Sequence, residues 1–301
     1  MQRRSMLTTG LALGLGAWGL SGCAFISKQQ AAAARTLSDE LAALEIQSQG
    51  RLGLHVLDTV SGAEAGWRGD ERFPMCSTFK TLLAARVLYL AQRDEIRLWR
   101  KLYYSPSEVV AWSPISEKRA GANGGMTVQE LCEAMVVVSD NTAANVMLEA
   151  SGGPAALTQW LRELGDGTTR LDRNEPSLNT ALPGDERDTT TPQAMVQSLQ
   201  KLLLGDVLEG YARALLQQWL ADSRTGDKRV RAGMPGDWKV GGKTGSGERG
   251  TACDTLIVWP TAQSAPLLVA AYLTGSPLDG AGREAVLARA GEAIKRWYYA
   301  I

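Results

Sequence analysis

The pattern of hydrophobic positions changes along this chain. Within 51–58, the positions from Leu52 to Val56 alternate as on a half-buried strand, and 63–67 follows after a turn as a second strand. The last third contains three more short strand-like segments, at 238–246, 255–259 and 267–273. Because short connections join these three segments, we expect them to pair antiparallel.

Between the early and late strands, apolar residues recur at the three- and four-residue spacing of helices. This period, with its capping and stop signals, predicts helices at 36–47, 82–90, 131–138, 142–149, 155–164, 192–204, 208–221 and 283–297. We therefore predict an α+β fold. We expect a five-stranded antiparallel sheet flanked by the N- and C-terminal helices to take up 36–68 and 222–301, and a helical domain to take up 69–221.

Two segments have no period. The segment 93–125 contains Trp112, which residue type alone places equally well on the surface or in the wall of a binding site. The segment 170–188 mixes charges of both signs, and a long aperiodic stretch inside a compact domain is usually functional or disordered. We predict that 170–188 is an Ω-loop held by its own ion pairs.

Composition excludes several classes of protein. The chain has 301 residues, with 32 basic and 32 acidic side chains, so it lacks the electrostatic footprint of a nucleic-acid-binding protein. No pair of its four cysteines has the spacing of zinc ligands. We expect no metal and no cofactor, and we expect a monomer.

The first 22 residues are predicted to be an export signal. Arg3-Arg4 precedes an apolar run that is too short to span a bilayer, which is typical of a twin-arginine signal. Leu20-Ser21-Gly22-Cys23 resembles a bacterial lipobox, in which Cys23 would be lipidated and become the new N-terminus. The alternative is cleavage near 31–34, which would release a soluble periplasmic protein.

Ser77 and Lys80 are the first candidates for catalysis. They lie one helical turn apart near the start of the helix predicted after Pro74, so the lysine amine could reach the serine hydroxyl and take its proton. The spacing alone is weak, because Ser198 and Lys201 repeat it within an ordinary amphipathic helix. His55, the only histidine, lies in mid-strand with no obvious carboxylate partner, so we interpret it as structural.

Three further motifs follow in order: Ser139-Asp140-Asn141, Glu175 with Asn179, and Lys243-Thr244-Gly245. Together with Ser77-x-x-Lys80, they resemble the motif set of the class A serine β-lactamases, and the resemblance extends from about Thr36 to the C-terminus. It implies hydrolysis of β-lactam antibiotics, with resistance to them, through an acyl-enzyme. It also implies an active site between the sheet domain and the helical domain.

The resemblance also implies roles for single residues. Ser77 attacks the lactam carbonyl, with Lys80 or Glu175 as base, Ser139 passes a proton to the leaving nitrogen, and Glu175 activates the water that releases the product. The backbone N–H groups of Ser77 and Ser246 form the oxyanion hole. The residues expected to bind substrate are Asn141, Asn179, Lys243, Thr244, Gly245, Ser246, Arg229 and Trp112.

Several features leave alternatives open. Arg229 could instead be a surface arginine. Cys76 resembles a cysteine that carbapenem-hydrolysing members bridge, but the partner position is Gly247, so we expect no bridge there, and Cys253 lies far along the next strand. A D-Ala-D-Ala peptidase or a β-lactam-sensing domain shares most of the motifs but lacks the deacylating carboxylate that Glu175 represents.

Overall fold

The computed structural model describes residues 27–261 and 264–301, so the predicted export signal and Cys23 lie outside the described residues. Five strands form one antiparallel sheet in the order β2-β1-β9-β8-β7. Their bounds are Arg51–Asp58 (β1), Glu64–Trp67 (β2), Lys239–Gly247 (β7), Thr251–Trp259 (β8) and Leu267–Thr274 (β9). The predicted antiparallel sheet, with two early and three late strands, is confirmed.

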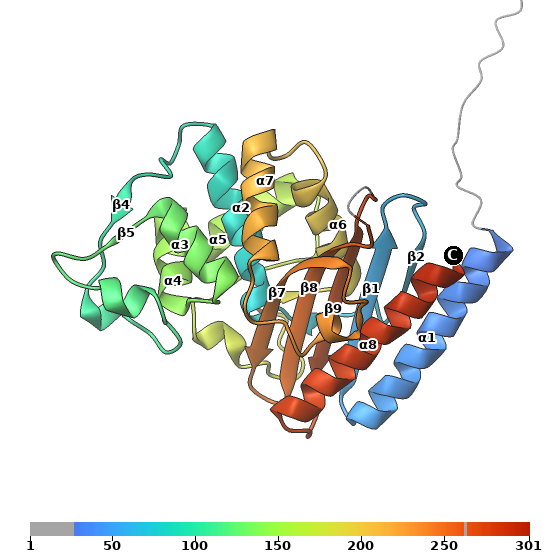
Figure 1. Cartoon of the computed structure of the whole chain (residues 1–301). Helices are drawn as coiled ribbons and strands as arrows, with labels where there is room; N and C mark the ends of the chain where they lie inside the picture. The colour runs from blue at the N-terminus through green and yellow to red at the C-terminus, as the bar shows by residue number, and fades with distance from the viewer. Residues whose placement is uncertain (1–26, 262–263) are drawn as a thin grey trace, which may run out of the picture.

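Two long helices lie side by side on one face of the sheet, α1 (Lys28–Ser48) and α8 (Gly280–Ala300) (Figure 1). The Gln29 side chain near the start of α1 donates to the Ala300 carbonyl at the end of α8, at 2.9 Å. Helix α1 begins at Lys28 rather than at Thr36 as predicted. Ser27 and Gln30 form a capping box that starts the helix there, and the alanine-rich residues that follow are good helix formers.

The other helices lie on the opposite side of the sheet or beyond it (Figure 1). Helices α6 and α7 pack against strands of the sheet, and α2 packs against α7 and α3. Along β9 the side chains alternate between two hydrophobic cores, with Ala270 and Tyr272 facing the helical half and Ala271 and Leu273 facing α1 and α8. These helices are α2 (Phe79–Gln92), α3 (Val128–Val137), α4 (Asn141–Ala150), α5 (Gly153–Glu163), α6 (Pro192–Leu203) and α7 (Gly210–Ala221).

Two small strand pairs occur where we predicted no regular structure. Strand β4 (Lys101–Leu102) pairs with β5 (Met126–Thr127), and β3 (Phe73–Pro74) pairs with β6 (Thr189–Thr190). Pairs of two residues give no detectable alternation, so the sequence pattern could not show them. The second pair joins the end of the Ω-loop to the segment just before Ser77. No helix in the described part of the chain is long and apolar enough to cross a membrane.

Candidate active site

Ser77 lies in a short 3-10 turn, η1 (Cys76–Thr78), that leads directly into α2. Its Oγ donates to Glu175 Oε1 at 3.0 Å. Lys80, the second residue of α2, places its Nζ 2.9 Å from the same carboxylate oxygen. The serine and the lysine of the motif are therefore linked through Glu175, which approaches them from the Ω-loop.

Lys80 is fully buried and surrounded by acceptors. Besides Glu175, its Nζ donates to Asn141 Oδ1 at 2.6 Å and to the Ser139 carbonyl at 3.0 Å. Burial lowers the pKa of the Lys80 amine, and the nearby Glu175 carboxylate opposes that shift. Lys80 thus ties three of the four predicted motifs together.

The Ser139-Asp140-Asn141 motif forms the turn between α3 and α4. Ser139 has a left-handed backbone with φ of 62°, and Asp140 caps α4 by accepting from the Ala143 N–H at 2.9 Å. The same Asp140 carboxylate accepts from the backbone N–H of Ser116 at 2.9 Å. Asn141 donates through its side chain to the Ala111 carbonyl. These bonds fix the turn, so Ser139 and Asn141 face Lys80 with little freedom.

Glu175 is held in place by two asparagines. Asn145 on α4 accepts from the Glu175 backbone N–H and donates to the Glu175 carbonyl, each at 2.9 Å. Asn179 donates to the other side-chain oxygen of Glu175 and to the Pro176 carbonyl. Sequence reasoning missed Asn145. Its only signal is its position one helical turn after Asn141, on the same face of α4.

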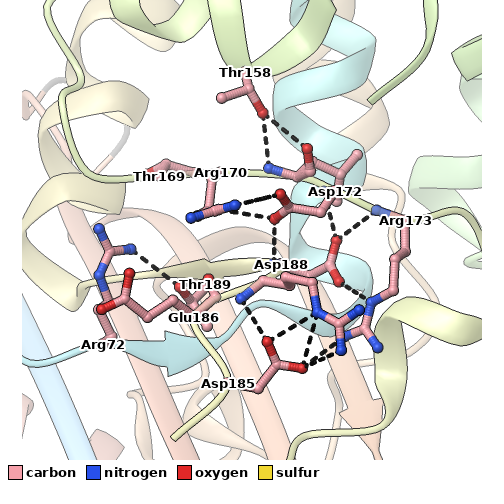
Figure 2. A network of polar contacts seen from close by, with 12 residues as sticks. Arg72, Thr158, Thr169, Arg170, Asp172, Arg173, Asp185, Glu186, Asp188 and Thr189 are labelled. Carbon is pink, nitrogen blue, oxygen red and sulfur yellow. Dashed lines mark hydrogen bonds and ion pairs between the residues drawn. The ribbon is translucent and has the colours of Figure 1, made fainter. Parts of the chain in front are cut away.

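The Ω-loop is closed by its own charged side chains, as Figure 2 shows. Arg173 pairs with Asp188, and Arg170 pairs with Asp172. The carboxylates of Asp172 and Asp188 also accept from each other's backbone N–H groups, at 3.0 Å and 2.8 Å. The predicted internal ion pairing is confirmed, and it stabilises the segment that carries Glu175.

Strand β7 forms the opposite wall of the site. Lys243 is fully buried, and its Nζ donates to Ser139 Oγ at 2.9 Å and to the Thr244 carbonyl at 2.7 Å. Burial, together with the nearby Lys80 charge, holds the pKa of Lys243 well below its usual range. A Cβ added at Gly245 would lie 3.1 Å from the Ser77 nitrogen, so glycine lets β7 approach the backbone of Ser77 this closely.

Arg229 reaches the same wall from the position just before the short 3-10 turn Val230–Gly233. Its Nη1 donates to the carbonyls of Gly245 and Cys253 at 2.7 Å and 2.8 Å, and its Nη2 donates to Ser246 Oγ at 2.7 Å. Only 7% of Arg229 is exposed, so the alternative interpretation as a surface arginine is wrong. The guanidinium lies beside the hydroxyl that we expect to meet the substrate.

A cavity of about 520 Å³ lies between these walls. Trp112, which is 66% exposed, stands at its rim, and its indole N–H donates to the Val138 carbonyl at 3.2 Å. Arg224 and Thr225 also line the cavity, and sequence reasoning missed both, because they lie in an irregular segment without a motif. The predicted residues that line it are Ser77, Trp112, Ser139, Asn141, Asn179, Arg229, Thr244, Gly245 and Ser246.

Two sequence features are structural. Ser198 donates to Asp166 at 2.7 Å, and Lys201 donates to the Leu164 carbonyl, so the second Ser-x-x-Lys only ties α6 to its neighbours.

His55 does have a carboxylate partner, contrary to our prediction, because its Nε2 lies 3.2 Å from Glu64 of the paired strand. Strands β9 and β8 separate β1 from β7, which places His55 away from the cavity. No cluster of metal-ligating side chains occurs among residues 27–261 and 264–301.

Cys76, Cys132 and Cys253 are free and buried, as predicted for Cys76. Cys253 is nearer than the sequence suggested. It pairs across the sheet with Gly245, which packs on Cys76, and the influence of the Cys253 thiol, together with burial, raises the pKa of Cys76. A Cβ added at Gly247 would lie 2.7 Å from Cys76 Sγ, so the glycine leaves room for that sulfur.

Comparison with known proteins identifies the family. A model of the β-lactamase enzyme family matches residues 36–298. The solved structure of an ancestral class A β-lactamase superposes with a TM-score of 0.84 at 55% identity, covering 86% of this chain and 98% of that one. This chain belongs to the class A β-lactamases. The class A β-lactamase is also 46% identical over 258 residues to a β-lactamase of Citrobacter koseri, covering 86% of this chain and 87% of the relative. It is 47% identical over 255 residues to the carbapenem-hydrolysing β-lactamase KPC of Klebsiella oxytoca, covering 84% and 86%.

Proposed function

We propose that this β-lactamase opens the lactam ring through an acyl-enzyme on Ser77 and releases the product through Glu175. The observation that carries the proposal is the shared carboxylate oxygen. Glu175 Oε1 accepts from Ser77 Oγ at 3.0 Å and lies 2.9 Å from Lys80 Nζ. Nucleophile, base and cation are therefore within hydrogen-bond distance before any substrate arrives.

In the first step, Ser77 Oγ attacks the lactam carbonyl and loses its proton. Two groups near the hydroxyl can receive that proton: the Glu175 carboxylate and the Lys80 amine, whose pKa burial lowers. The backbone N–H groups of Ser77 and Ser246 stabilise the oxyanion. As the C–N bond breaks, Ser139 passes its hydroxyl proton to the lactam nitrogen and regains one from the acylation base through Lys80, whose Nζ lies 3.5 Å from Ser139 Oγ. Glu175 is therefore ionised for the second step. Lys243, 2.9 Å from Ser139 Oγ, stabilises the negative charge that develops on that oxygen.

Substrate binding uses the rest of the cavity wall. Lys243, Thr244 and Ser246 of β7, together with Arg229, bind the carboxylate that penicillins carry, because they offer positive charge and hydroxyl donors. Asn141 donates to the side-chain amide of the substrate, and Trp112 covers the substrate at the rim. All of these groups come from one chain, so the proposed site needs no second subunit to act on a small molecule.

In the second step, Glu175 takes a proton from a water that attacks the acyl ester, and Asn179 keeps the carboxylate in position. The bond between the acyl carbon and Ser77 Oγ then breaks, and Glu175 returns the proton to that oxygen. Acylation has two candidate bases, but deacylation has only Glu175. Glu175→Gln keeps the shape and the acceptor oxygen but removes the base. We expect deacylation to fall by about 10²–10⁴-fold. The variant should accumulate an adduct on Ser77 whose added mass equals the whole penicillin, because ring opening expels nothing.

The matched control is Ser77→Ala, which should form no adduct. Mass spectrometry of the intact protein after incubation with benzylpenicillin measures both outcomes. Steady turnover of nitrocefin by the wild type favours hydrolysis, whereas a burst that stops would indicate a β-lactam-sensing domain. Wild-type turnover by Glu175→Gln would show that the proposed mechanism is wrong.

We further propose that the enzyme is exported by its twin-arginine signal and anchored through Cys23. The structure supports a cleavage site before residue 27, because cleavage near 31–34 would remove the capped first turn of α1 and its bond to Ala300. Cys23→Ala should abolish lipid labelling and release the enzyme into the soluble periplasm. A mature wild-type N-terminus near Ala34 would contradict the anchor.

A further inference from the structure

One fully buried carboxylate near the site takes part in none of these steps. Asp254 lies on β8, directly opposite Thr244 of β7 and Ala271 of β9, and none of it is exposed. Its Oδ2 accepts from the Val230 backbone N–H at 3.2 Å. Its Oδ1 has no hydrogen-bond partner among the described residues, although a buried carboxylate usually has several.

The bond to Val230 fixes the backbone next to Arg229. That arginine is the cation that acts most strongly on Asp254, followed by Arg231 and then by Lys243 of β7. Glu284 of α8 lies 3.8 Å from the Arg229 Nε. This Nε is also buried and has no hydrogen-bond partner within the described residues. Arg229 thus has two carboxylates in its surroundings, of which Asp254 is the buried one.

The charge of Asp254 depends on pH in the physiological range. Burial raises the pKa of this carboxyl to about 7, because the three nearby cations only partly offset the loss of solvation. Below that pH the group becomes neutral, and the buried Arg229 loses one of its two flanking charges.

We propose that Asp254 is a positioning residue for Arg229 and that it acts through Arg229 on the binding of the substrate carboxylate. The inference rests on the proposed role of Arg229 at the cavity wall. Ionised Asp254 anchors the Arg229 backbone through Val230 and balances the guanidinium charge, which leaves Nη2 aimed at Ser246. Protonated Asp254 holds the arginine less firmly, so the carboxylate is bound more weakly.

The test is a double-mutant cycle with benzylpenicillin, measured from pH 5.5 to 8.5. In the wild type, KM should rise as pH falls through about 7, by about tenfold, the size expected for losing one charge-assisted contact. Asp254→Asn should show the raised KM at every pH, with kcat changed less than KM. In the Arg229→Ala background, Asp254→Asn should change KM by less than twofold, because its effect passes through the missing arginine.

Two further measurements keep the test decisive. Arg229→Ala alone should lose the step in KM near pH 7, and this result does not require Asp254→Asn to fold. Equilibrium binding of benzylpenicillin to Ser77→Ala should show the same pH step in Kd without interference from acylation. Glu284→Gln, the control at the second carboxylate near Arg229, should retain the step, since Asp254 is intact.

The outcomes separate this inference from the proposed function. A wild type that does not hydrolyse penicillin refutes the function itself. A hydrolysing wild type whose KM has no step near pH 7, or whose step survives Arg229→Ala, refutes only the role of Asp254. Additive effects of the two substitutions would show that Asp254 acts on binding independently of Arg229, and they would also overturn the inference.

Discussion

Lys80 and Lys243 are both fully buried on opposite sides of Ser139, but their surroundings differ. Lys80 lies 2.9 Å from a carboxylate oxygen of Glu175. Lys243 has no carboxylate within ion-pair distance among the described residues, and its Nζ donates only to Ser139 Oγ and the Thr244 carbonyl. The charge of Lys80 is therefore paired with a carboxylate of the protein, whereas the charge of Lys243 is not.

This difference in pairing suggests that the two lysines have different roles on the two sides of the cavity. An ammonium group buried without an anion lowers the stability of the fold, and an anionic ligand that reaches it relieves that cost. Lys243 is on the side where we expect the substrate carboxylate. The proposed division is therefore that Lys80 belongs to an internal catalytic pair, whereas the substrate completes the pairing of Lys243.

The largest effect should follow from Lys80→Met. The substitution leaves the Glu175 carboxylate buried without its cation, and breaking such a pair typically costs about 3–5 kcal/mol of unfolding free energy. Turnover should fall by about 10²–10⁴-fold. Urea unfolding and benzylpenicillin hydrolysis measure the two losses. Lys80→Met combined with Glu175→Gln, which leaves no lone charge, should recover part of the stability. If the double variant is no more stable, the ion pair does not explain the loss.

A smaller effect, of a different kind, should follow from Lys243→Met. Catalytic efficiency should fall about ten- to a hundredfold, because one charge-assisted contact contributes roughly 1.5–3 kcal/mol. Unlike Lys80→Met, this change removes an unneutralised charge, so the free energy of unfolding should stay the same or rise. A loss of stability as large as that of Lys80→Met would remove the distinction between the two lysines.

The pH dependence of the free energy of unfolding should reveal the titration of a third buried charged group, Asp254. The Asp254 pKa is about 7 in the folded protein and ordinarily 3.8, so between these pH values the folded state keeps a proton that the unfolded state has released. The free energy of unfolding should therefore fall as pH rises through this window, by about 1 kcal/mol per pH unit. Asp254→Asn should lack that contribution in urea unfolding from pH 4 to 8. Parallel curves for the two proteins would show that Asp254 titrates normally.

The smallest effect should come from Cys76→Ser. The hydroxyl can bond where the thiol now meets Cys253, so the cost should be about 1 kcal/mol or less. The matched control is Cys132→Ser. Burial alone raises the pKa of the Cys132 thiol, and the new hydroxyl would enter an apolar core. It should cost more. In the unfolded protein, alkylation without a reductant should modify Cys76, and a bridge that needs prior reduction would contradict the structure.

The architecture was largely predictable because hydrophobic periodicity records burial. Each of the five sheet strands and eight α-helices in the described part of the chain was expected, and the errors lie at their ends, as at Lys28, where a capping box outweighs a weak hydrophobic pattern. The position of Ser77 relative to Lys80 was predictable because a helical turn sets it. That Glu175 meets both could be expected only from the resemblance to a family, since 95 residues or more separate it from them.

The supporting residues were not predictable. Asn145, Arg224, Thr225 and Asp254 belong to no motif, and each matters only because chain segments distant in sequence meet in the fold. Asp254 reads as an ordinary strand residue until Arg229 is found beside it. Hydrophobic periodicity shows which face of an element is apolar. It does not show which polar side chains are buried or which groups they contact.

The paired bonds between Asn145 and the backbone of Glu175 also restrict which residues this position can accept. The side chain at position 145 must donate to the Glu175 carbonyl and accept from the Glu175 N–H, with each bond at 2.9 Å. Aspartate has nearly the same shape but lacks the donor, leucine lacks both groups, and glutamine is one methylene too long. A side chain that never touches the antibiotic is thus almost as constrained as the nucleophile. In a saturation library selected on penicillin, position 145 should rank with position 77 among the least tolerant sites.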